Sequence, residues 1–202
     1  MKSATGGLQA LTRANTFLRI PKERIGVLIG PDGKTKKTIE KNLSVELQID
    51  SDTGGVIITL SEKAEEPSLL FKAKDVVTAI GRGFSPEHAF KLIRDEESML
   101  EVIDLRAMFG KSESDLKRVK GRIIGMDGKT RRIIEELTDT NVCVYGHTVS
   151  IIGNVENVQV AREAIQMLIS GSQHSVVYRF LHRRRRELKK KMLELWEKPS
   201  EE

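Results

Sequence analysis

The chain has few of the features that mark disulfide-linked or membrane-spanning proteins. Its 202 residues include one cysteine, so no internal disulfide can form and a reducing compartment, the cytoplasm, is expected. The longest uninterrupted apolar run, Val142–Tyr145, is far too short to cross a bilayer. The segment from Met1 to Thr16 has no apolar stretch typical of a secretory signal peptide. The sequence therefore predicts a protein that acts without a membrane.

Residue patterns typical of metal sites and catalytic triads are also missing. The single cysteine, Cys143, lies in an apolar segment that resembles a strand, where a small buried side chain is expected. The four histidines do not show the spacing of metal ligands; they are His88, His147, His174 and His182. We therefore predict no metal and no cofactor.

A nucleotide-hydrolysing enzyme is excluded by spacing. The phosphate-binding loop of such enzymes needs a glycine five residues before its Gly-Lys-Thr or Gly-Lys-Ser. That tripeptide begins at Gly33, Gly110 and Gly128. The positions five residues earlier hold Leu28, Leu105 and Ile123. We predict that the protein is not an enzyme and has no small-molecule substrate.

Charge is concentrated near the C-terminus. The formal net charge is +5, and the segment from His174 to Lys198 alone carries +6, with nine lysines and arginines against three acidic residues. The remainder of the chain is therefore nearly neutral. Such an asymmetry favours a polyanionic partner.

A fifteen-residue segment occurs twice, ninety-five residues apart. Residues 26–40 recur as residues 121–135, and the two copies share their glycines, an aspartate, a Lys-Thr pair, two following cations and an Ile-Glu pair. A repeat of this length indicates a duplicated structural unit. The sequence therefore predicts two domains.

Both copies show the same order of expected elements. The first has a strand at 16–20, helices at 22–29 and 34–41, strands at 45–49 and 56–60, and an amphipathic helix at 67–80. The second has a strand at 99–108, helices at 113–124 and 129–137, strands at 142–145 and 149–152, and a helix at 155–170. Between the copies, Ser85 and Pro86 indicate the start of a short linker helix that ends near Arg94.

This order, strand, helix, Gly-x-x-Gly, helix, strand, strand, helix, resembles the type I KH domain. Two glycines remove side chains where a nucleic-acid backbone must come close, and the next helix directs free N–H groups toward a phosphate. KH loops of this kind hold about four nucleotides of single-stranded RNA. The expected RNA-binding residues are Gly30, Pro31, Asp32, Gly33, Lys34, Lys37, Gly125, Met126, Asp127, Gly128, Lys129 and Arg132.

Other features of the loops qualify this picture. The alternative to a KH loop is a helix–turn–helix corner in which the glycines serve only to turn the chain. Two copies of the loop, each within the same order of strands and helices, argue against this alternative. The central loop positions, often basic in KH domains, hold Pro31-Asp32 and Met126-Asp127. We expect each aspartate to weaken phosphate binding and to act as the N-cap of the next helix. Apolar walls for the bases are expected from Ile25, Val27, Leu28, Ile123 and Ile124.

The basic C-terminal segment is predicted to form an amphipathic helix. Apolar residues recur three, four or seven apart at Val177, Leu181, Leu188, Met192 and Leu195. The cations include Arg183, Arg184, Arg185 and Arg186. A phosphate-contacting extension, a solvated terminal helix and a helix on a membrane surface all fit this pattern.

Beyond the KH pattern, the chain resembles one family, the KH proteins of small-ribosomal-subunit assembly, whose eukaryotic members are called dimethyltransferase-interacting proteins and are partners of the endonuclease that trims the rRNA. The resemblance lies in segments 79–86, 121–130 and 168–178 and in the basic tail. It implies binding near the 3′ end of small-subunit rRNA, with ribosome assembly or translation initiation factors as partners. The intact first loop is unlike the eukaryotic members and indicates an archaeal source. A related KH assembly factor of the same pathway is a close alternative.

The combined prediction is an α+β protein with two tandem type I KH domains, each β-α-α-β-β-α. The expected segments are an N-terminal tail (1–13), the first KH domain (14–84), a linker helix (85–97), the second KH domain (98–171) and a basic C-terminal helix (172–202). The expected function is binding of single-stranded RNA. The alternative is a KH scaffold that recruits assembly or translation factors and binds little RNA itself.

Overall fold

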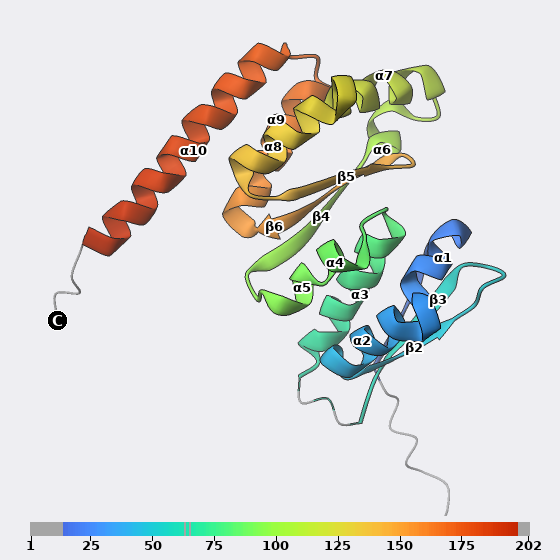
Figure 1. The fold of residues 1–202 in the computed structure, drawn as a ribbon. Helices are drawn as coiled ribbons and strands as arrows, with labels where there is room; N and C mark the ends of the chain where they lie inside the picture. The colour runs from blue at the N-terminus through green and yellow to red at the C-terminus, as the bar shows by residue number, and fades with distance from the viewer. Residues whose placement is uncertain (1–13, 63, 65, 198–202) are drawn as a thin grey trace, which may run out of the picture. The chain divides into compact units, whose positions relative to one another are not determined.

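The computed structural model describes residues 14–62, 64 and 66–197, without the side chains of residue 192 and residues 194–197. The chain divides into two compact units, and the boundary lies between Arg94 and Asp95 (Figure 1). The expected N-terminal tail, residues 1–13, lies outside the described residues.

The first unit has the predicted order of elements. They are β1 (Asn15–Arg19), α1 (Lys22–Ile29), the 3-10 turn η1 (Pro31–Gly33), α2 (Lys34–Leu43), β2 (Val45–Ile49), β3 (Gly55–Leu60) and α3 (Ser68–Gly81). The strands form an antiparallel sheet in the order β1-β3-β2. Its elements therefore confirm the predicted β-α-α-β-β-α order.

Alternation along the strands separates an inner from an outer face of the first sheet. In β2, Val45 and Leu47 are buried while the residues between and after them are exposed. On the outer face Phe17 of β1 lies directly opposite Ile57 of β3, and their side chains are 65% and 40% exposed. The first unit therefore keeps an apolar patch on the face away from its core.

The expected single linker helix is wrong: this stretch forms two short helices, α4 (Pro86–Ala89) and α5 (Lys91–Arg94). Ser85 is the N-cap of α4, as predicted, and its hydroxyl accepts the N–H of His88. The chain turns at Phe90, and both short helices pack against α3. Packing on α3 explains the break, because the turn lets Ala89 and Leu92 both be buried.

The second unit repeats the same order with one addition. Its elements are β4 (Ser98–Asp104), α6 (Leu105–Phe109), α7 (Glu113–Ile124), the 3-10 turn η2 (Met126–Gly128), α8 (Lys129–Thr138), β5 (Asn141–Tyr145), β6 (Thr148–Asn154) and α9 (Val155–Ile169). The sheet is antiparallel in the order β4-β6-β5. Cys143 lies in β5 as expected, but it is half-buried.

The predicted strand at 99–108 was too long, because β4 ends at Asp104 and helix α6 follows. The carboxylate of Asp104 accepts the N–H of Arg106 at 2.8 Å and so begins the helix. The N–H of Leu105 is bonded to the carbonyl of His147 at 2.9 Å. The Asp104 cap therefore ends β4, although the apolar pattern of the sequence continues beyond it.

The C-terminal segment forms one helix, α10 (His174–Glu197), which packs on α8 and α9 of the second unit (Figure 1). Val177 and Leu181 are fully buried in the core of that unit, and Leu188 is partly buried against it. These three confirm the predicted apolar face. Met192 and Leu195, also predicted there, lie outside the described side chains.

Candidate nucleic-acid interface

The two Gly-x-x-Gly loops have nearly the same backbone. Gly30 and Gly125 have φ of 71° and 70°, and each begins a 3-10 turn that leads into the next helix. The second glycines, Gly33 and Gly128, are left-handed, with φ of 72° and 75°. The repeat seen in the sequence is therefore a repeat of loop conformation.

The first glycine of each loop is required by close packing as well as by its backbone angles. A Cβ on Gly30 would lie 2.2 Å from the hydroxyl oxygen of Thr35 and 2.9 Å from its backbone nitrogen. On Gly125 the corresponding distances to Thr130 are 2.3 Å and 2.9 Å. The loop therefore folds tightly onto the helix that follows it, and a side chain has no room there.

The expectation that the loop aspartates cap the next helices is wrong. Asp32 and Asp127 are themselves left-handed, with φ of 53° and 51°, and Gly33 and Gly128 occupy the N-cap positions with no side-chain hydrogen bond. Short polar residues tolerate this conformation better than other non-glycine residues. The aspartates are therefore explained by the turn.

Two of the expected phosphate-binding cations bind the loop backbone. The Lys37 ammonium donates to the carbonyl of Asp32 at 3.4 Å, and the Arg132 guanidinium donates to the carbonyl of Asp127 at 2.6 Å. Both hydrogen bonds support the left-handed residue of their own loop. Lys37 and Arg132 thus stabilise the turns. Both side chains are exposed, so their positive charges lie at the surface beside the loops.

Lys34 and Lys129, by contrast, have exposed side chains, and their ammonium groups bond to no residue that the structure describes. Each is the first residue of its helix, where the backbone N–H groups have no intrahelical partner and the helix dipole is positive. A flexible ammonium beside free N–H groups is an arrangement that binds phosphate.

The cations between these positions have a different role. Lys36 and Arg131 lie 3.8 Å from the carboxylates of Glu40 and Glu135. These glutamates, which end the sequence repeat, accept the backbone N–H of Leu47 and of Val142. Both copies therefore have a glutamate at this position because its carboxylate joins the helix after the loop to the next strand by a hydrogen bond.

The expected apolar wall is only partly available. Ile25, Leu28 and Ile123 are buried in the cores, with exposures of 5%, 0% and 0%, so they cannot contact bases. Val27 and Ile124 remain partly exposed. Ile25 and Leu28 are three residues apart and so lie on the same helix face, which packs into the core; the expected wall wrongly included residues of this buried face.

The basic tail is less free than its sequence indicates. Arg183 and Arg184 lie 3.8 Å and 2.9 Å from the carboxylate of Glu187, whereas Arg185 and Arg186 are exposed without a partner among the described residues. Two of the four arginines are thus available for a polyanion.

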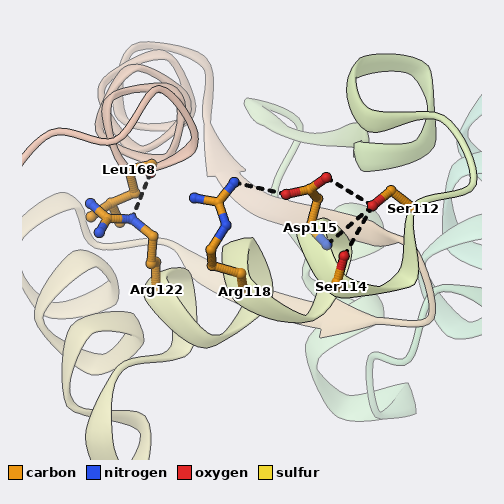
Figure 2. A network of polar contacts seen from close by, with 6 residues as sticks. All are labelled: Ser112, Ser114, Asp115, Arg118, Arg122 and Leu168. Carbon is orange, nitrogen blue, oxygen red and sulfur yellow. Dashed lines mark hydrogen bonds and ion pairs between the residues drawn. The ribbon is translucent and has the colours of Figure 1, made fainter.

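Sequence inspection missed an arginine in each unit that fixes the end of the last KH helix. Arg24 of α1 donates to the carbonyls of Ile80 and Phe84 at 2.8 Å and 2.5 Å. Arg122 of α7 donates to the carbonyls of Leu168 and Ser172 at 3.1 Å and 2.5 Å, and Figure 2 shows its bond to Leu168. Only the tertiary position of those carbonyls reveals either contact.

The start of α7 carries a polar network, also drawn in Figure 2. Ser112 is the N-cap and its hydroxyl donates to the carboxylate of Asp115 at 2.8 Å, while Arg118 donates to the other carboxylate oxygen at 3.0 Å. The Ser112 hydroxyl, and after it Arg118, lower the pKa of Asp115 below its ordinary value. Arg118 is thereby oriented along the same helix as Arg122.

The described residues contain no group of three or more histidine, cysteine, aspartate or glutamate side chains placed to hold a metal ion. None of the helices in the described part of the chain has both the length and the apolar character needed to cross a membrane.

Two family models match the chain, one in each half. Residues 99–186 match the second KH domain of PNO1 proteins, a eukaryotic-type, type I KH domain, and residues 21–95 match the first KH domain of Krr1. Together with the strand order of both sheets, these matches confirm an α+β protein with two KH domains and a C-terminal helix.

Similar proteins come from archaea and eukaryotes. A KH domain-containing protein of Methanocaldococcus jannaschii is 52% identical over 92% of this chain and 80% of its own length. The RNA-binding protein pno1 of Dictyostelium discoideum is 31% identical over 79% of this chain and 66% of its own length, so the chain spans just under two thirds of that relative. A relative named for RNA binding supports the prediction that the chain is not an enzyme.

A solved structure of a complex between a/eIF2alpha, aDim2p and rRNA from Pyrococcus horikoshii contains a chain with a TM-score of 0.82 to this one. The two are 47% identical, and the match covers 89% of this chain and 98% of that one. The higher identities to archaeal proteins agree with the expected archaeal source.

Proposed function

Because the chain belongs to the Dim2/Pno1 family of KH-domain proteins, we propose that it binds single-stranded small-subunit rRNA near its 3′ end during maturation of the subunit. The Pyrococcus complex, which holds a related chain together with rRNA, supports this proposal. Its place of action is then the cytoplasm, and its protein partners are assembly or translation initiation factors.

The observation that carries the proposal is the pair of matched loops, each with a lysine whose ammonium has no partner among the described residues. Gly30 and Gly125 let the backbone turn directly over the helix that follows. The N–H of Lys34 and of Lys129 is bonded within the loop, to Pro31 or Met126, and the N–H groups of the next residues in the first turn have no intrahelical partner. A phosphate group of RNA can accept from these N–H groups and pair with the ammonium. The sugar-phosphate backbone is thus held without regard to sequence.

The bases are expected to lie on the side of each loop where Val27 and Ile124 are partly exposed. In the second unit this side is bounded by the β5–β6 turn, because Lys120 of α7 donates to the carbonyl of Gly146 at 3.0 Å. Recognition of a single strand by a phosphate-binding loop beside an apolar wall is the KH mode of binding.

The test is fluorescence anisotropy with a labelled single strand that matches the 3′ end of small-subunit rRNA, with a scrambled strand as control. Lys34→Ala and Lys129→Ala should each weaken binding, and the double variant should weaken it most. Lys111→Ala is the matched control, since Gly110-Lys111-Ser112 repeats the tripeptide pattern without a Gly-x-x-Gly turn. Equal binding by the double variant and the wild type would refute the assignment of the RNA site to the loops.

A second function, docking of a protein, is favoured by the apolar patch of Phe17 and Ile57 in the first unit. The patch borders a hollow of about 270 Å³ that is lined also by Gln48 and Asp50. The α subunit of initiation factor 2 is the partner we propose, because a related chain forms a complex with that subunit. Phe17→Ser should weaken capture of the purified subunit and leave RNA affinity unchanged; the reverse result would assign the patch to RNA.

A further inference from the structure

Helix α7 of the second unit has three distinct faces. Leu116, Val119 and Ile123 point into the core, with exposures of 7%, 0% and 0%. Lys120 is directed to the β5–β6 turn by its bond to Gly146. The third face carries Arg118 and Arg122, which Figure 2 shows one turn apart. This face therefore lies on the other side of the helix from the place where the bases are expected, beside Ile124 and the β5–β6 turn, which we call the groove.

A shallow cavity of about 430 Å³, open to solvent, lies between this third face, the second loop and α10. Arg118 of α7, Met126 and Lys129 of the loop region, and His174 and Tyr178 of α10 are among the residues that line it. The volume is in the range of sites that hold small organic ligands. The loop thus borders two different spaces, the groove and this cavity.

The aromatic side chains of the cavity are held in place by their polar atoms. The Tyr178 hydroxyl lies 2.9 Å from the hydroxyl of Thr130, and Nε2 of His174 donates to the carbonyl of Arg122 at 2.9 Å. The centroids of the two rings are 6.2 Å apart. Since Thr130 also packs against Gly125, the Tyr178 ring is fixed directly beside the loop.

The charges and apolar surface of the cavity suit one nucleotide of RNA. Lys129 is unpaired among the described residues, and Arg118 is oriented by its hydrogen bond to Asp115. The Met126 side chain is 81% exposed and offers apolar surface at the rim. A fixed aromatic ring with cations nearby is the combination that binds a base and its phosphate.

We propose that this cavity binds one nucleotide of the RNA strand, adjacent to those held in the groove, with its base stacked on Tyr178 and its phosphate near Lys129 and Arg118. The proposal rests on the proposed function, because a strand gripped at the loop brings the neighbouring nucleotide to the cavity. The second KH domain then contacts RNA on both sides of its loop, and α10 takes part through its first turns as well as through its cationic residues.

The experiment compares a labelled strand of about four nucleotides with strands extended at the 5′ or the 3′ end. Anisotropy is measured for the full chain and for Tyr178→Leu and Tyr178→Phe. The leucine variant loses the ring, whereas the phenylalanine variant keeps the ring and loses only the bond to Thr130. Urea unfolding of both variants verifies that they remain folded.

For one of the extended strands, we expect Tyr178→Leu to bind about 5- to 150-fold more weakly than the wild type, the range for loss of one stacked base. Tyr178→Phe should stay close to the wild type, and the short strand should show no difference. A 4-thiouridine in the extension should crosslink to the peptide that contains Tyr178.

Other outcomes overturn the proposal in distinguishable ways. Equal loss in the leucine and phenylalanine variants with every strand would mean that Tyr178 only braces the loop through Thr130. No loss in either, with wild-type binding intact, would leave the cavity without an RNA role. Failure of the wild type to bind any strand would instead refute the proposed function.

Discussion

At the scale of single residues, the two glycines of the second loop are required for different reasons. Gly128 has a φ of 75°, but a Cβ there would meet nothing within 4 Å, so only its backbone angles oppose substitution. Gly125 has both a φ of 70° and a backbone nitrogen at 2.9 Å from any added Cβ. Position 125 therefore tolerates substitution less well than position 128.

This difference predicts the order of two substitutions. Gly128→Ala should lower the free energy of unfolding by about 1–2 kcal/mol, the penalty of the left-handed conformation. Gly125→Ala should lower it further and should weaken RNA binding more, because Thr130 and the start of α8 must shift. Urea unfolding and anisotropy check both effects. Equal stability of the two variants would show that the loop relaxes without strain.

A second residue-scale prediction concerns the stability of the protein at acidic pH. The pKa of Asp115 is lowered by the Ser112 hydroxyl and by Arg118, so the folded state favours the carboxylate. A lowered pKa in the folded state contributes stability above the ordinary aspartate pKa of about 4, which is lost as the pH falls through the folded value.

Asp115→Asn should therefore be less stable than the wild type near neutral pH, and this difference should shrink below about pH 4. Unfolding midpoints in urea between about pH 6 and pH 3 measure it. Asp139→Asn, at an exposed aspartate outside the network, is the control. A difference that stays constant with pH would mean that the amide disturbs the helix start in some other way.

At the scale of elements, the arginine contacts fix where the last helix of each KH domain ends. Arg122 donates to the carbonyl of Leu168 in the last turn of α9 and to that of Ser172 just after it, and His174 of α10 bonds to the carbonyl of Arg122 itself. Helix α7 is therefore linked through one residue to the end of α9 and the start of α10.

Removal of the Arg122 hydrogen bonds should destabilise the protein more than removal of the neighbouring ion pair of Arg118. Arg122→Met should lower the free energy of unfolding by about 2–3 kcal/mol, because charged hydrogen bonds to carbonyls are lost. Arg118→Met, one turn earlier and bonded at the surface to Asp115, should lower it by about 0–1 kcal/mol. Chemical denaturation measures both. A smaller effect at Arg122 than at Arg118 would contradict the role given to the contact.

Most of the helices and strands could be predicted from the sequence. The repeat and the apolar patterns predicted every KH helix and strand, because period and turn residues act locally. Helix α6 and the break between α4 and α5 were missed, since they depend on the Asp104 cap and on packing against α3. In the site, the predicted positions of Lys34 and Lys129 at the start of the helices after the loops are confirmed. The hydrogen bonds of Lys37 and Arg132 to the loop backbone were not predicted, because they require knowledge of carbonyl positions.

At the scale of the whole molecule, each unit has its own core and its own loop, with a lysine that has no side-chain partner in the described part of the chain. If both loops contact RNA, their phosphate contacts add. The slope of the logarithm of the binding constant against the logarithm of salt concentration should then be roughly −3 to −6, at about 0.7 for each phosphate contact on a single strand.

Lys34→Ala and Lys129→Ala should each reduce the magnitude of that slope by about 0.7, and the double variant by about twice as much. Titrations of the same RNA over a range of salt concentrations provide the slopes. A change in only one of the single variants would assign RNA binding to one unit and leave the other for a protein partner.

The positions of the two arginine contacts have a consequence for exchanging parts between the halves. At the ninety-five-residue offset of the repeat, Arg24, two residues before the repeated segment, corresponds to Val119, a fully buried residue, and Arg122 corresponds to Val27. A chimera that carried α1 in place of α7 would put an arginine into the second core and leave the end of α9 unsecured. An unpaired buried charge is strongly destabilising. The loops thus share one conformation, whereas the helices that precede them are specific to their own half.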